Sequence, residues 1–262
     1  MLEGKTVLLG VTGSIAAYKI AYLASMLKKQ QADVHVLMTR NATNFINPIT
    51  FETLTGNKCL VDTFDRNFQF QVEHVALAKR ADLAIVAPAT ANIMAKVANG
   101  IADDLVSSTL LARECHLLLC PAMNVEMWRN PATVRNVQTL KADGILFSGP
   151  EAGSQACGDV GEGRLREPAQ ILEDIEAFFT PSILSGKKIL LTAGPTFEPF
   201  DPVRGITNGS SGRQAAAIAA AAVRAGAEVT IVSGPVAISY PNKANVIPVR
   251  KAQEMFDTVK KE

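Results

Sequence analysis

The 262-residue chain has only four cysteines, one tryptophan and no marked excess of either charge. Cys59, Cys115, Cys120 and Cys157 form no CxxC pair and have no histidine at metal-ligand spacing, which argues against a zinc site and a disulfide framework. The 26 basic and 25 acidic residues give a formal charge of +1. No general attraction to nucleic acid or to an anionic membrane is therefore expected.

Long apolar runs are also missing. None approaches the roughly 20 residues of a membrane-spanning helix, and the N-terminus runs into a strand-like segment without the features of a secretory signal. We therefore expect a cytoplasmic protein. The composition, 48% hydrophobic and 19% charged, is typical of a globular chain of one or two domains.

Cysteine context separates one thiol from the others. Cys59, Cys115 and Cys120 adjoin apolar runs and are expected to pack in the core. Cys157 lies in the glycine-rich stretch 149–164, which predicts a mobile surface loop rather than a helix or strand. Two interpretations stay open: a lid over a small anionic substrate, ending in Arg164 and Arg166, or a flexible connection with an incidental cysteine.

Short apolar runs alternate with helical patterns along the first part of the chain. Near-continuous apolar strands of this kind are typical of a parallel sheet covered on both faces. The pattern predicts an α/β fold with a doubly wound parallel sheet. The expected strands cover residues 6–11, 34–38, 83–87, 117–120 and 144–147, with a helix over 15–28 after the first.

Polar and small residues follow four of these strands, at 12–16, 39–42, 88–93 and 121–124. The carboxyl ends of parallel strands meet at one sheet edge, where ligands bind in such folds. Each junction alone could be a plain connection, but four on one edge favour a site. Three segments far apart in the chain also carry reactive side chains. His74 offers a base, Asn124 an amide and Cys157 a thiol, which together could form a reaction centre.

Residues 13–19, 88–92, 121–124 and 154–158, with His74, occur in the order and spacing of a known family. Through them residues 1–182 resemble the flavin-containing cysteine decarboxylases, and specifically the decarboxylase half of bifunctional coenzyme A biosynthesis enzymes. The resemblance implies FMN-dependent conversion of 4′-phosphopantothenoylcysteine to 4′-phosphopantetheine: oxidation of the thiol to a thioaldehyde, loss of carbon dioxide and reduction of the enethiol. Flavin is needed because an unmodified cysteine offers no sink for the electrons that the carboxylate leaves behind.

The resemblance also assigns roles to residues. His74 would act as base, although a histidine satisfied near a helix start is the alternative; Asn124 would bind the substrate carboxylate, and Cys157 would protonate the enethiol. Lys79 is a candidate for the substrate phosphate. Family sites lie between subunits of a trimer, which can assemble into a dodecamer, and residues 44–49 would suit such an interface. The implied FMN contacts are Gly13, Ser14, Ile15, Thr39, Thr90, Ala91, Asn92, Ile93 and Ala122.

Residues 183–262 predict a second α/β region, with strands at 188–192 and 228–232 and a helix over 214–225. Segments 192–204 and 206–212 resemble the start of phosphopantothenate-cysteine ligase, which uses CTP and Mg²⁺, and Arg204 and Asn208 match positions of its acyl-cytidylate step. Residues 212–215 read Gly-Arg-Gln-Ala where that family has Gly-Lys-Met-Gly. The chain also ends within a helical pattern, so we expect a truncated ligase fragment without ligase activity or CTP binding.

Two other functions stay open. One is oxidative decarboxylation of a C-terminal peptide cysteine, against which the ligase-like segment argues. The other is a non-catalytic, flavin-binding regulatory subunit, which could do without the set His74, Asn124 and Cys157.

Overall fold

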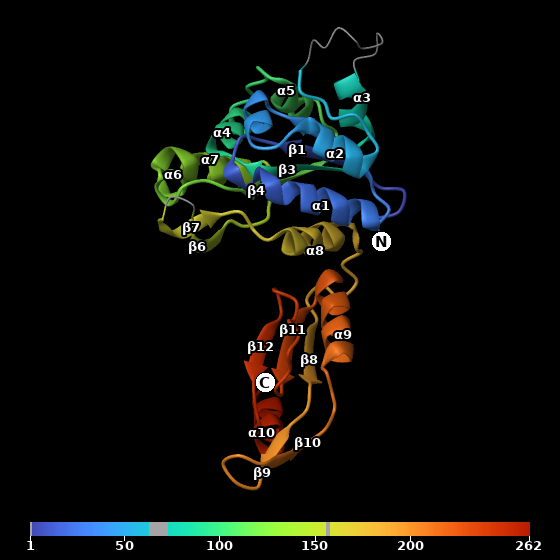
Figure 1. Cartoon of the computed structure of the whole chain (residues 1–262), viewed down its shortest axis with the longest axis vertical. Coiled ribbons are helices and arrows are strands. Elements are labelled where there is room, and N and C mark those ends of the chain that lie inside the picture. The colour runs from blue at the N-terminus through green and yellow to red at the C-terminus, as the bar shows by residue number, and fades with distance from the viewer. Residues whose placement is uncertain (1, 63–72, 156–157) are drawn as a thin grey trace. The chain divides into compact units, whose positions relative to one another are not determined.

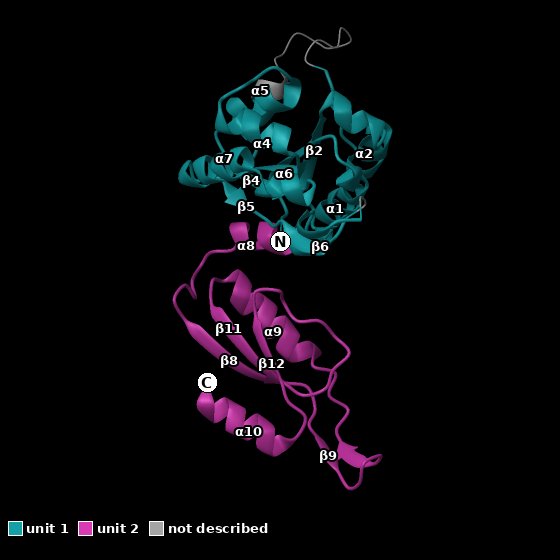
Figure 2. Cartoon of the chain, turned by 90° about the vertical axis from the view of Figure 1, so that its left-hand side faces the viewer, with its two compact units in different colours: residues 1–172 teal, residues 173–262 magenta. Residues whose placement is uncertain are grey.

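The computed structural model describes residues 2–62, 73–155 and 158–262 and divides the chain into two compact units, Met1–Leu172 and Glu173–Glu262 (Figure 2). The division falls inside helix α8, Pro168–Phe179. The expected domain boundary after residue 182 stays a prediction.

The first unit is built on a five-stranded parallel sheet with the order β2-β1-β3-β4-β5 (Figure 1). Apolar residues run continuously along the central strands because both faces are covered; all seven residues of β3 are buried. This confirms the doubly wound α/β fold. The strands are β1 Thr6–Val11, β2 Asp33–Met38, β3 Leu83–Ala89, β4 His116–Pro121 and β5 Leu146–Phe147.

Helices cover both faces of this sheet. Figure 2 shows α4 and α7 on one side and α1 and α2 on the other. In the part of the chain that the structure describes, no helix is long and apolar enough to span a bilayer. The helices are η1 Ile15–Ala17, α1 Tyr18–Lys29, η2 Arg40–Asn44, α2 Pro48–Thr55, α3 Glu73–Arg80, α4 Ala91–Ala98, α5 Leu105–Leu111, α6 Val125–Arg129 and α7 Pro131–Ala142.

The glycine-rich stretch is not the loop that composition predicted. Strands β6, Glu151–Ser154, and β7, Val160–Arg164, form an antiparallel hairpin with an irregular register next to Glu151. Contacts distant in sequence hold the hairpin: the Met123 N–H donates to the Gly163 carbonyl at 2.9 Å, and Gln155 Nε2 donates to the Met123 carbonyl at 3.1 Å. Glycine is needed in this strand because the backbone of Met123 lies directly against Gly163 and leaves no room for a side chain.

The second unit contains a three-stranded parallel sheet with the order β12-β11-β8. The sequence predicted only two of these strands; β12 is short and was not expected. The small core includes Ala219, Ala222, Val229 and Ile231. The elements are β8 Lys188–Ala193, β9 Phe197–Pro199, β10 Gly205–Thr207, α9 Arg213–Arg224, β11 Glu228–Ser233, β12 Asn245–Pro248 and α10 Ala252–Lys261, with β9 and β10 forming a hairpin.

The expected core cysteines pack as predicted. Cys120 and Cys59 are buried, and the half-buried Cys115 packs against the core. Burial, with a smaller effect of Glu52, raises the pKa of the Cys59 thiol to about 12.

We expect Cys59 to be nearly inert toward alkylation in the folded chain. At about pH 8 its native labelling by iodoacetamide should be at least ~100-fold slower than in urea, because both the thiolate fraction and the access are small. Peptide mass spectrometry after timed labelling measures both rates. Equal native and denatured rates would contradict the burial of this thiol.

Candidate functional site

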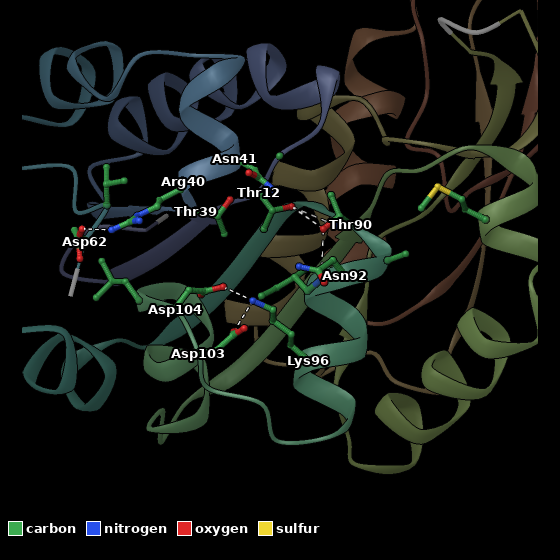
Figure 3. Close-up of a pocket in the computed structure, with 16 residues that line it drawn as sticks. Thr12, Thr39, Arg40, Asn41, Asp62, Thr90, Asn92, Lys96, Asp103 and Asp104 are labelled. Atoms are coloured by element: carbon green, nitrogen blue, oxygen red, sulfur yellow. Dashed lines mark hydrogen bonds and ion pairs between the residues drawn. The ribbon is translucent and has the colours of Figure 1, made fainter. Parts of the chain in front are cut away.

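A cavity of about 610 Å³ lies at the carboxyl end of the first sheet (Figure 3). It is lined by residues that follow β1, β2 and β3. The strand order reverses direction between β1 and β3, and in open α/β sheets this reversal creates the crevice where ligands bind. Six of the predicted cofactor contacts line the cavity: Gly13, Thr39, Thr90, Ala91, Asn92 and Ile93.

Threonines fix the three junctions around this cavity. Thr12 Oγ1 donates to the Pro88 carbonyl at 2.7 Å and accepts from the Thr90 N–H at 3.3 Å, which ties the end of β1 to the end of β3. Thr39 caps η2 and Thr90 caps α4 through their side-chain oxygens. Helix N-termini thus face the cavity with fixed geometry, as a site for an anionic or polar ligand requires.

Gly13 brings two junctions into contact. A Cβ at this position would lie 2.6 Å from Asn41 Cβ, a distance that side chains do not tolerate. Glycine therefore lets the turn after β1 touch the turn after β2, and both turns line the cavity.

Paired charges form the other wall of the cavity. Lys96 Nζ lies 2.5 Å from Asp103 and 2.6 Å from Asp104 (Figure 3). Burial lowers the pKa of Lys96, but the hydrogen bonds to the two carboxylates outweigh burial and raise it. Opposite, Arg40 pairs with Asp62 at 2.7 Å.

No sequence pattern indicated that Lys96, Asp103 and Asp104 would form a charged cluster at the site. Lys96 follows Asn92 by one helical turn, so both residues belong to the same helix face. The pattern Asp104-x-x-Ser107 is a recognisable helix start, and the structure contains this capping box. These patterns place Lys96 and Asp104 on helix surfaces, but only the packing of α4 against α5 shows that they pair.

We expect Asp104→Asn to lower the free energy of unfolding by about 1 kcal/mol at about pH 7. Asparagine keeps the cap to Ser107 but loses the charge beside Lys96. Burial alone would raise the pKa of Asp104, yet the hydrogen bonds from Lys96 and Ser107 hold the pKa below its ordinary value.

The stabilising charge is therefore fully present above the unfolded-state pKa of about 3.9 and is lost as pH falls through the lower folded-state pKa. Urea unfolding of parent and variant should show a difference at neutral pH that shrinks on acidification. Asp103→Asn, at the more exposed partner of Lys96, serves as control and should cost less. A pH-independent difference would rule out the charge as its source.

Asn124 lies at a second position on the same sheet edge, after β4. It caps α6: its Oδ1 accepts from the Glu126 N–H at 2.8 Å. Its Nδ2 donates to Asp159 Oδ2 on the β6–β7 hairpin at 2.6 Å. The hairpin and the turn 121–124 therefore meet at Asn124, and the described residues on either side of 156–157 contact Met123 and Asn124.

Other predicted residues are placed less completely. The predicted proton donor, Cys157, lies outside the described residues. The predicted base, His74, belongs to α3, but its side chain is not among those that the structure describes. Lys79 is exposed on the same helix.

Three predicted cofactor contacts do not line the described part of the cavity. Ser14 caps η1, Ile15 is 61% exposed, and Ala122 is buried, with its N–H donating to the Ala89 carbonyl. Their roles stay predictions.

The two arginines at the end of the hairpin are paired with carboxylates of the chain. Arg164 contacts Glu167, which also accepts from Lys19 at 2.7 Å. Arg166 lies 3.8 Å from Glu151. The hydrogen bond from Lys19 is the main reason that the pKa of Glu167 lies below its ordinary value. These pairs fix the base of the hairpin.

The second unit has a cavity of about 460 Å³ beside the glycine-rich start of α9, lined in part by Gly194, Gly212 and Arg213. Arg204 and Asn208 are not among its described lining residues. Arg204 Nε donates to Asp201 at 2.7 Å, and Asn208 Oδ1 accepts from the Ser210 N–H at 2.9 Å. Within the described ranges, no group of three or more His, Cys, Asp or Glu side chains could hold a metal ion.

Comparison with known proteins identifies relatives of both units. Residues 1–180 match the flavoprotein family, and residues 184–262 match the DNA/pantothenate metabolism flavoprotein C-terminal domain. The Coenzyme A biosynthesis bifunctional protein CoaBC of Vibrio vulnificus is 48% identical over 98% of this chain, and that of Bacillus subtilis is 46% identical over 99%. The chain spans 64% and 65% of the lengths of these two relatives.

Solved structures resemble the first unit. A cysteine-to-serine mutant of PPC decarboxylase, complexed with pantothenoylaminoethenethiol, has a TM-score of 0.61 and 29% identity, covering 67% of this chain and 98% of that one. The FMN-dependent cysteine decarboxylase SpaF has a TM-score of 0.56 and 34% identity, covering 62% and 91%. The chain belongs to the flavoprotein family and is a homologue of the bifunctional CoaBC proteins of coenzyme A biosynthesis.

Proposed function

We propose that the first domain, residues 1–182, binds FMN and decarboxylates 4′-phosphopantothenoylcysteine to 4′-phosphopantetheine. The observation that carries the proposal is the meeting of Asn124 with Asp159 of the β6–β7 hairpin, on the same sheet edge as the cavity after β1, β2 and β3. Asp159 follows the proposed proton donor, Cys157, by two positions in the sequence. The similarity to PPC decarboxylase and to CoaBC supports the choice of substrate.

The cavity fits FMN in size and chemistry. Its volume lies within the usual range for cofactor sites, roughly 300 to 1,000 Å³. A flavin binds at the corresponding strand reversal in folds with this strand order. Gly13 keeps the turn compact, Thr39 and Thr90 present capped helix starts, and Asn92 offers an amide. Arg40 and Lys96 are paired with carboxylates, so backbone amides at helix starts are the expected phosphate partners.

Bound FMN would supply the oxidising power that turns the substrate thiol into an electron sink. The chain's own residues would handle the carboxylate and the protons. The Asn124 amide donates through Nδ2 and cannot take up a proton, so it can hold a carboxylate in its charged form. His74 would remove a proton from the substrate, and Cys157 would return one after carbon dioxide has left.

The substrate phosphate needs a cation or a backbone site in this scheme. Lys79, exposed on the helix that carries His74, is our candidate for this contact.

We also propose that the active form is a homo-oligomer based on a trimer, either the trimer alone or a dodecamer built from trimers. The exposed fractions of Ile15 on η1 and of Tyr18 and Tyr22 on α1 are 61%, 62% and 63%. The three residues follow one another at helical spacing beside the turn after β1. Phe45 and Ile49, in the expected interface segment 44–49, are also exposed. Such apolar faces favour contact with a second copy. Analytical ultracentrifugation tests this state, and a cytoplasmic location stays a prediction.

No ligase reaction is proposed for residues 183–262 of this chain. The candidate residues Arg204 and Asn208 are engaged in local hydrogen bonds. CTP and Mg²⁺ are proposed only as ligands of a complete ligase domain. Calorimetric titration with CTP tests this expectation, which detectable binding would overturn.

The decisive test measures carbon dioxide and 4′-phosphopantetheine formed from 4′-phosphopantothenoylcysteine by the flavin-loaded chain, with Cys157→Ser in parallel. Turnover by the parent and accumulation of an oxidised enethiol by the variant would support both the reaction and the proton donor. A flavin-loaded parent that released no carbon dioxide would refute the proposal. Turnover of a peptide ending in cysteine would then identify a peptide decarboxylase, and inactivity on both substrates would favour a flavin-binding regulatory subunit.

A further inference from the structure

The two ends of the Asn124 amide make different contacts. Oδ1 is committed to the helix, because it accepts from the Glu126 N–H at 2.8 Å as the cap of α6. The cap fixes the rotation of the amide and directs Nδ2 away from the helix start. Asn124 therefore presents a hydrogen-bond donor, and not its carbonyl oxygen, to a ligand.

Nδ2 donates to a carboxylate of the chain itself. Asp159 Oδ2 accepts this hydrogen bond at 2.6 Å, short enough for a charge-assisted bond. The backbone of Asp159 is tied into the hairpin, since its carbonyl accepts from the Gln155 N–H at 2.9 Å. Gln155 Nε2 in turn donates to the Met123 carbonyl, next to Asn124. The carboxylate is thus held at the amide by contacts on both sides.

We propose that the Asp159 carboxylate holds the place of the substrate carboxylate at Asn124 and has to leave when substrate binds. The inference rests on the proposed function. The substrate carries the same chemical group as Asp159, and Nδ2 has a second N–H, so the two carboxylates would lie side by side at one amide and repel each other. The decarboxylated product has no carboxylate, so Asp159 can return to Asn124 without competition. Asp159 therefore weakens the binding of the carboxylated substrate and leaves the binding of the product unaffected.

The test compares two probes that cannot react through a thiol. One is 4′-phosphopantothenoylserine, which has a hydroxyl in place of the thiol and keeps the carboxylate; the other is its counterpart without the carboxylate. Calorimetry gives the Kd of each for the flavin-loaded parent, Asp159→Ala and Asp159→Asn. The control is Glu162→Gln, which removes a carboxylate of the same hairpin that accepts from Trp128 Nε1 on α6 at 3.2 Å.

We expect Asp159→Ala to bind the carboxylated probe roughly tenfold more tightly than the parent and the other probe equally well. Asp159→Asn keeps an oxygen acceptor but loses the charge, so a smaller gain is expected. Glu162→Gln should match the parent with both probes. This pattern would not arise from a structural role of Asp159, which would alter both probes alike.

Three results would overturn the inference. Unchanged or weaker binding of the carboxylated probe by both Asp159 variants would mean that Asp159 orients Asn124 for the ligand or does not act on it. An equal gain for both probes would mean that Asp159 merely obstructs the site. Binding of neither probe to parent and variants would refute the proposed substrate itself, and the inference with it.

Discussion

Asn124→Asp is expected to reduce decarboxylation by about 10²- to 10³-fold while leaving helix α6 capped. Aspartate is as good a capping residue as asparagine, so the hydrogen bond from the Glu126 N–H can persist. The Nδ2 donor is lost, however, and a negative charge replaces it. That charge would repel both the substrate carboxylate and Asp159.

The matched control for this variant is Asn130→Asp. Asn130 caps the next helix, α7, through an Oδ1 that accepts from the Ala132 N–H at 2.9 Å. The control makes the same chemical change in the same kind of cap, which bonds to the start of its own helix. Steady-state kinetics should show near-parental turnover for the control. Comparable losses in both variants would indicate damage to helix starts, and turnover by Asn124→Asp at the parental rate would exclude Asn124 from carboxylate binding.

Gly163→Ala is expected to lower the free energy of unfolding by about 2 to 3 kcal/mol and to remove most activity. A Cβ at this position would lie 2.4 Å from the Met123 carbonyl oxygen and 2.7 Å from Gln155 Nε2. The φ of +137° is also one that residues with side chains rarely adopt. Relief requires the hairpin to move off Met123, which breaks both hydrogen bonds to the main chain of Met123.

Gly158→Ala separates backbone strain from this clash. Gly158 also has a positive φ, +91°, but a Cβ there would meet no described atom within 4 Å. Urea unfolding should therefore show a smaller loss, on the order of 1 kcal/mol, for Gly158→Ala. Limited proteolysis of the hairpin should accelerate only for Gly163→Ala. Equal stability losses would mean that the close approach to Met123 contributes nothing.

The first sheet could be predicted from the sequence because its strands are nearly continuous apolar runs. Strands β1 and β3 owe their limits to local pattern, and the polar residues after them mark the edge with the cavity. The β6–β7 hairpin could not be predicted in this way. Its glycines are poor strand formers, and the backbone that holds the β6–β7 pair belongs to Met123, about forty residues earlier in the chain.

The candidate site likewise contains residues that local sequence patterns indicate and residues whose roles depend on partners distant in sequence. Gly13, Thr39 and Thr90 lie in the junctions after predicted strands, and the family resemblance implies them as cofactor contacts; all three line the cavity. Lys96 was missed because its role depends on two carboxylates from the start of another helix, and no local pattern encodes that pairing. Asp159 was missed for the same reason, since its partner Asn124 lies 35 positions away in sequence.

The hydrogen bonds between the hairpin and Met123 use only main-chain atoms of Met123: its N–H and its carbonyl oxygen. These bonds place no demand on the side chain at position 123, which packs against the core of the first sheet instead. Proline is the exception, because it has no N–H to give to Gly163. Position 123 is thus subject to two separate constraints: its backbone holds the hairpin beside Asn124, and its side chain fills the core.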